Sequence, residues 1–114
     1  MLVYKGDFET QKLAANSESA ESLRKINSGE FLEGLLHARK AVEFDPSGSE
    51  VRSVFCVALV ANGSPPETSQ ECETARELLE RDSLTNTRGY MLVREAVVKL
   101  QSGDTPRIVR KPEP

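Results

Sequence analysis

Few side chains in this sequence are of the types that perform catalysis or bind metal ions, and none is grouped in a pattern typical of either function. The one histidine, His37, has only Glu33, one helical turn before it, as a possible co-ligand, whereas a metal site needs at least three protein donors. Paired acids such as Glu71 and Glu73 are typical of solvated helix surfaces. The seven glycines are isolated from one another, so the sequence has no Gly-rich phosphate loop. We therefore predict a protein that is not an enzyme and holds no metal and no cofactor.

The two cysteines, Cys56 and Cys72, lie within apolar helical patterns, without the short spacing of a zinc site or a redox motif. A catalytic Cys56 would need a base beside it, but its sequence neighbours are Phe55 and Val57. We predict two buried, reduced thiols in a cytoplasm-like compartment, and a disulfide is the alternative.

The composition is that of one small domain with a single core. The chain has 114 residues, of which 38% are hydrophobic and 29% charged, and it has no Trp. A chain of this length buries roughly two thirds of its unfolded surface. The net charge of -3, without a long run of like charge, makes nucleic acid a poor candidate partner.

The longest apolar run, residues 54–61, is far shorter than the roughly 18 to 20 residues that cross a bilayer. The first residues also lack the basic start and apolar core of a signal peptide. We therefore expect a soluble, cytoplasmic protein without membrane insertion.

The two ends of the chain have weaker patterns than the middle. Residues 1–16 show no strong hydrophobic period and are predicted to be an N-terminal arm or a short helix, before a helical domain over residues 17–102. Ser17 or Ser19 is the predicted cap of its first helix, which should end near Gly29. Residues 103–114 contain three prolines and little apolar content, which predicts a flexible tail.

Helices are predicted over residues 30–44, 67–82 and 86–101 from apolar residues that recur every three or four positions. The first has one apolar row formed by Phe31, Leu35, Ala38 and Val42, and a second formed by Leu32 and Leu36. Between these helices, residues 49–61 form a segment with almost no polar face, for which Ser49 is the expected cap. A helix that is apolar all round must be enclosed on all sides. A β-strand is the alternative because the segment has four valines, but its length favours a helix.

A short internal match links two of these helices. Residues 38–46 align without a gap with residues 75–83, 37 positions later, and four of the nine pairs are identical. Each copy is the end of a helix, followed by a turn that begins with aspartate, at Asp45 and Asp82. The match predicts repeated helical hairpins.

Ser28-Gly29-Glu30-Phe31, followed by Gly34, Ala38, Ala41 and Asp45-Pro46, resembles the second half of a tetratricopeptide repeat. In that family, small residues let two helices approach closely and proline closes the unit. The first helix departs from the family pattern, because Glu18, Glu21, Ser22 and Lys25 stand where it prefers leucine or aromatic, glycine and tyrosine residues. The resemblance implies an all-α fold in which about five helices form antiparallel hairpins stacked as a right-handed superhelix. An unrelated helical bundle is the alternative.

The same resemblance implies a groove, lined by the first helix of each unit, that binds an extended peptide or a helix of another protein. Its pattern, carried onto this chain, marks eight residues: Glu50, Ser53, Val57, Val60, Ala61, Tyr90, Arg94 and Val97. Because this lining is mostly apolar, we expect an adaptor or scaffold that binds an apolar or amphipathic segment of a partner.

Two other functions stay open at this point. The chain could be a small dedicated chaperone of a secreted or aggregation-prone subunit, or a structural subunit that self-associates as a homodimer. The central helix could equally be covered by the N-terminal segment or by a second copy of the chain.

Overall fold

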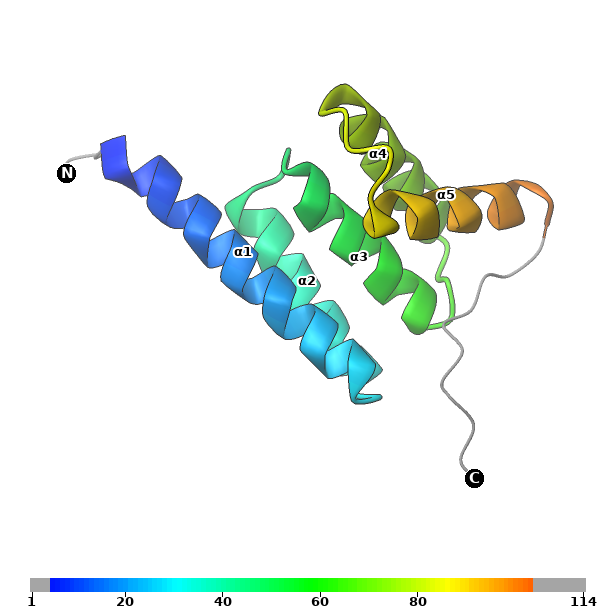
Figure 1. Cartoon of the computed structure of the whole chain (residues 1–114). Coiled ribbons are helices and arrows are strands. Elements are labelled where there is room, and N and C mark those ends of the chain that lie inside the picture. The colour runs from blue at the N-terminus through cyan, green and yellow to red at the C-terminus, as the bar shows by residue number, and fades with distance from the viewer. Residues whose placement is uncertain (1–4, 104–114) are drawn as a thin grey trace.

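The computed structural model describes residues 5–103 of the chain, and side chains from Glu9 onward (Figure 1). This part of the chain is all-α, without a strand, as the sequence predicts. Its helices are α1 (Lys5–Asn27), α2 (Phe31–Phe44), α3 (Ser49–Ala61), α4 (Thr68–Arg81) and α5 (Arg88–Gln101). The predicted tail lies outside the described residues, apart from Gly103.

The helices form antiparallel hairpins that stack side by side (Figure 1). Each helix packs against the next one along the chain, and α3 packs in addition against α1 and α5. In the described part of the chain, α2 does not contact α4, and α1 does not contact α5. The helices α1, α3 and α5 lie toward the viewer in Figure 1, with α2 and α4 behind them. The central position therefore belongs to α3, which alone touches every other helix.

The amino acids of α3 explain this position. Three groups of buried apolar residues form the core, and α3 contributes to each of them. Cys56 and Val60 pack with α4 and α5, Phe55 and Leu59 pack with α2, and Val51 packs against both α1 and α2. Burial of each large apolar side chain stabilises the fold by about 1.5–3 kcal/mol. The prediction that this helix must be enclosed is confirmed on most of its circumference.

The four later helices lie within two residues of their predicted bounds. The predicted cap of α3 is wrong by one position, because Gly48 is the N-cap and Ser49 is the first helical residue, without a capping hydrogen bond. The first helix ends near Gly29 as predicted, with Asn27 as its last residue, and the φ of 84° at Gly29 lies in the left-handed region that glycine adopts most easily.

The first helix differs most from its prediction. It runs without interruption from Lys5 to Asn27, so Ser17 and Ser19 lie inside it and neither of them caps a helix. Its buried positions are Ala15, Ser19, Ser22 and Ile26, spaced by three or four residues. Because three of these four side chains are small or polar, they produce no clear hydrophobic period in the sequence. The helix is held by close packing against α2 and α3 instead.

A close approach between α1 and α2 uses the small side chains of both helices. The Ser22 hydroxyl donates a 2.6 Å hydrogen bond to the carbonyl of Gly34. A Cβ atom at Gly34 would lie 2.7 Å from Cγ1 of Ile26 and 3.1 Å from the carbonyl oxygen of Ser22. A side chain at position 34 therefore cannot fit unless the two helices move apart.

We predict that Gly34→Val lowers the free energy of unfolding by about 2 kcal/mol, because overpacking of a helix contact costs roughly 1–3 kcal/mol. The matched control is Glu43→Val, which places the same residue on an exposed position of α2 and costs at most about 0.7 kcal/mol through helix propensity. Urea unfolding followed by circular dichroism measures both. Equal stability of the two variants would contradict the close approach.

Candidate functional site

The structure joins the two cysteines that the sequence analysis treats as reduced thiols. Cys56 on α3 and Cys72 on α4 form a disulfide, with their Cα atoms 4.8 Å apart and both side chains fully buried. The prediction of free thiols is therefore wrong. Sequence spacing does not reveal this bond, because the two residues lie on different helices and meet only when α3 and α4 pack. The disulfide joins α3, the helix with most of the predicted groove residues, to α4.

Replacement of both cysteines by alanine should lower the free energy of unfolding by about 3 kcal/mol, since the bond closes a loop with a sequence separation of 16. A reductant should destabilise the native chain in the same way and leave the double variant unchanged. Thermal unfolding with and without dithiothreitol tests both statements. A native chain that is indifferent to dithiothreitol would contradict the bond.

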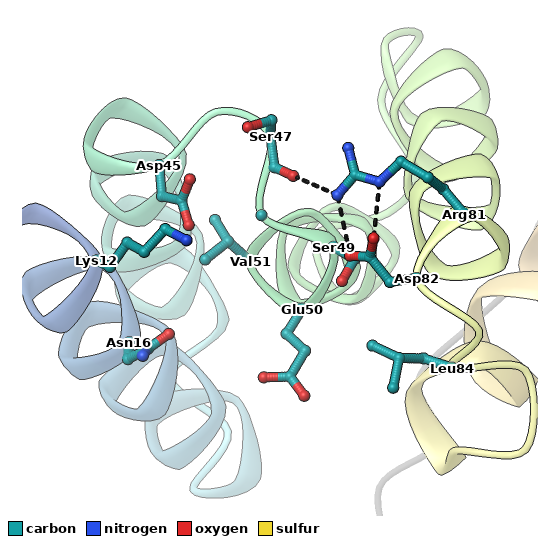
Figure 2. Close-up of a pocket in the computed structure, with 11 residues that line it drawn as sticks. Lys12, Asn16, Asp45, Ser47, Ser49, Glu50, Val51, Arg81, Asp82 and Leu84 are labelled. Atoms are coloured by element: carbon teal, nitrogen blue, oxygen red, sulfur yellow. Dashed lines mark hydrogen bonds and ion pairs between the residues drawn. The ribbon is translucent and has the colours of Figure 1, made fainter. Parts of the chain in front are cut away.

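An open pocket of about 330 Å³ lies where α3 begins (Figure 2). Lys12 and Asn16 of α1 line one side, and Arg81 and Asp82 at the end of α4 line the other. Glu50 stands on the first turn of α3 between them. The walls are polar and carry both signs of charge.

One wall of the pocket is fixed by a charge network. Nε of Arg81 lies 2.7 Å from Oδ1 of Asp82, and Nη2 of Arg81 donates to the Ser47 carbonyl at 3.3 Å. The Arg81 guanidinium, followed by a hydrogen bond with Ser49, lowers the pKa of the Asp82 carboxyl from 3.8 to about 2. Asp82 is therefore an anion at neutral pH and ties the end of α4 to the start of α3.

Because the pKa of Asp82 is lower in the folded chain, this network stabilises the fold above pH 3.8 and loses that effect as the pH falls toward 2. Arg81→Gln should raise the pKa of Asp82 more than Ser49→Ala does, since Arg81 is the larger cause. Carboxyl ¹³C chemical shifts followed over a pH titration measure this. An Asp82 pKa unchanged by Arg81→Gln would contradict the assignment.

The only histidine has a structural partner that its sequence neighbourhood does not contain. Nδ1 of His37 on α2 lies 2.6 Å from Oε1 of Glu18 on α1, and both side chains are half-buried. Glu33, the expected neighbour, is not this partner. Among the described residues, no three His, Cys, Asp or Glu side chains gather as metal ligands. The contact fastens α1 to α2.

The eight predicted groove residues differ in burial and lie on different surfaces. Ser53, Val60 and Val97 are buried. Glu50 is exposed at the pocket, and Val57 and Ala61 are half-buried on α3. Tyr90 and Arg94 line a separate shallow depression on α5.

Tyr90 is turned toward α4, not toward α3. Its hydroxyl donates a 2.7 Å hydrogen bond to Oε2 of Glu80, which lowers the pKa of the Glu80 carboxyl and raises that of the Tyr90 phenol. The structure thus brings Glu50, Val57 and Ala61 together on one helix and places Tyr90 and Arg94 on another surface.

We define the α3 strip as Glu50, Val57 and Ala61, which recur along one side of α3. Val57 follows Glu50 by two helical turns, so the two residues share a side of the helix. On α1, which packs against α3, Leu23 follows Asn16 by the same distance, so Leu23 lies on the side of α1 that, further toward the start of the chain, lines the pocket. Leu23 is exposed. It is a residue that the sequence analysis did not assign to the groove.

The opposite edge of the α3 strip faces α5. A Cβ atom at Gly89 would lie 3.0 Å from Oγ of Ser53, so α5 crosses α3 beside Ser53. Leu92, one turn further, is also exposed. The helices α1 and α5 do not contact each other, and between them Val57 and Ala61 pack partly against the core group of α1, α2 and α3 and stay partly exposed.

The other side of α3 is closed by ion pairs and stacking. Nη1 of Arg52 lies 2.7 Å from Oε1 of Glu71 on α4, and Nε of Arg52 donates to the Pro46 carbonyl at 2.6 Å. Arg39 of α2 pairs with Glu67 at 2.9 Å and stacks over the ring of Phe55. These contacts leave the strip between α1 and α5 as the open side of the central helix.

Comparisons of the chain with protein-family models, with curated proteins and with solved structures found no match. In the part of the chain that the structure describes, no helix has the length and hydropathy needed to cross a membrane. The fold and this surface define an all-α protein of stacked helical hairpins whose central helix is partly uncovered.

Proposed function

We propose that the chain is a protein-interaction module, an adaptor or scaffold, that binds an amphipathic segment of another protein along the α3 strip. The main observation is that the most apolar helix of the fold contacts every other helix, while its Val57 and Ala61 stay partly exposed. Leu23 of α1 and Leu92 of α5, on the two helices that neighbour α3 here, are also exposed. We call the α3 strip together with these two leucines the proposed channel; a helix that lays its apolar face on it would bury all four apolar side chains.

The pocket at the start of α3 would orient such a segment. Glu50 and Asn16 lie at one end of the strip and present polar groups, whereas Val57 and Ala61 at the other end present apolar surface. A partner segment that is cationic at one end and apolar at the other matches this gradient. The tetratricopeptide resemblance supports the proposal, because that family binds peptides on the corresponding side.

We further propose that the protein folds where disulfides can form. The expected cytoplasmic location rested in part on reduced thiols, and the buried bond between Cys56 and Cys72 removes that part of its support. Disulfides of this kind persist in oxidising compartments. A partner would then be a protein of the same compartment.

Photo-crosslinking in the native cells tests the interaction. A benzophenone amino acid at Leu23 or at Leu92 should crosslink one and the same partner protein, identified by mass spectrometry. The matched control is Leu36, an exposed leucine on α2 that is not part of the channel. Crosslinks that form equally from Leu36, or different proteins captured from Leu23 and Leu92, would contradict a single binding channel.

A further inference from the structure

The outer side of α5 is a second uncovered surface, separate from the α3 strip. The inner side of this helix packs against α3 and α4 through buried Val93, Ala96 and Val97. Its outer side carries Met91, which is 65% exposed, and Val98, which is 52% exposed. These two residues line a shallow, mostly apolar depression together with Tyr90, Arg94, Glu95 and Lys99. Among the described helices, only α3 and α4 contact α5, and Tyr90 at the edge of the depression reaches Glu80 of α4.

The spacing of apolar and charged residues along α5 is symmetric about the point between residues 94 and 95. Met91 stands three positions before Arg94, and Val98 stands three positions after Glu95. On a helix, residues three and four apart lie on one side, so these four side chains form a single row. The row has an apolar residue at each end and one charge of each sign in the middle.

A second copy of α5, antiparallel to the first, is complementary to this row. A two-fold axis between residues 94 and 95 places Met91 against Val98 of the second copy, and Arg94 against Glu95 of the second copy. The same axis brings Tyr90 beside Lys99 of the second copy. Each contact occurs twice, as an isologous interface requires. In the monomer, the charge of Arg94 acts on Glu80 of α4 although no salt bridge joins these two described residues, while Glu95 has a 3.3 Å pair with Lys99.

We infer that the outer row of α5, formed by Met91, Arg94, Glu95 and Val98, is the contact surface of a homodimer of this chain. The occupant is a second copy because charge and apolar surface alternate in a self-complementary order. One helix from each copy gives an interface at the small end of the known range, so the dimer is weak and depends on concentration. It leaves the α3 strip free.

The exposed leucines of α2 do not have this property. Leu32 and Leu36 are also exposed, but a two-fold axis midway between them places Lys40 opposite Ser28 and so pairs no opposite charges. The nearby Arg39 is already engaged by Glu67 and by the ring of Phe55. The axis that pairs the two apolar residues thus also pairs opposite charges on α5, and it does not do so on α2.

The inference is tested on the full chain by sedimentation equilibrium over a wide range of protein concentration. The native chain should rise from the monomer mass toward the dimer mass. Arg94→Glu places two acids opposite each other in the dimer, and Glu95→Arg places two arginines opposite each other. Each change should weaken dimerisation by about tenfold or more. Lys40→Glu, an equal change of charge on an exposed position of α2, is the control and should leave the dimer intact.

Two rescue measurements make the test specific for self-pairing. The double variant Arg94→Glu/Glu95→Arg restores opposite charges at both positions and should dimerise again. An equimolar mixture of the two single variants should form a heterodimer, although neither variant forms a homodimer alone. Circular dichroism of each variant confirms that the helices are retained.

Three results would overturn the inference. A native chain that stays monomeric at every concentration means that something else, or solvent alone, covers this row. A dimer that is unaffected by either single variant places the interface elsewhere. Single variants that weaken the dimer but are rescued neither by the double change nor by mixing would show that the charges act through folding.

Discussion

The requirement to enclose one apolar helix determines the rest of this structure. Residues 49–61 have no polar side wide enough to face water, so α3 forms only as neighbours are placed around it. The hairpin partner α4 covers one side, α2 and α1 cover the next, and α5 covers a third. Ion pairs such as Arg52 with Glu71 then close the seam that water would otherwise reach. The side of α3 that stays partly exposed is narrow, and the proposed function is based on it.

The sequence predicted best the helices in which apolar residues recur every three or four positions. Phe31, Leu35 and Ala38 produce a clear period, and α2 begins and ends close to its predicted bounds. The first helix was predicted to begin near Ser17 or Ser19, much later than Lys5, because its contact side includes Ala15, Ser19 and Ser22, which give no clear hydrophobic period. Close packing of small side chains leaves little signal in one sequence.

The candidate site was predictable only within single helices. Glu50, Val57 and Ala61 follow one another on α3, and their spacing alone places them on one side. The relation of α3 to α5 depends on the angle between the helices, which no residue pattern gives. Tyr90 therefore lies toward Glu80 of α4, and the residue pattern did not assign Leu23 and Leu92 to the proposed binding surface. The disulfide could not be predicted for the same reason, because Cys56 and Cys72 meet only through the packing of two helices.

The pattern of helix contacts also determines how the molecule can open. Because α1 does not touch α5, the contacts form an open chain and not a closed ring. Each terminal helix is held by two neighbours, whereas the middle hairpin is joined covalently between Cys56 and Cys72. Local opening thus costs least at the two ends and most at α3, so amide protons should be protected in a gradient from the centre outward. A surface carried by α5 belongs to the most readily opened part, and any molecule bound there would also act as a clamp on it.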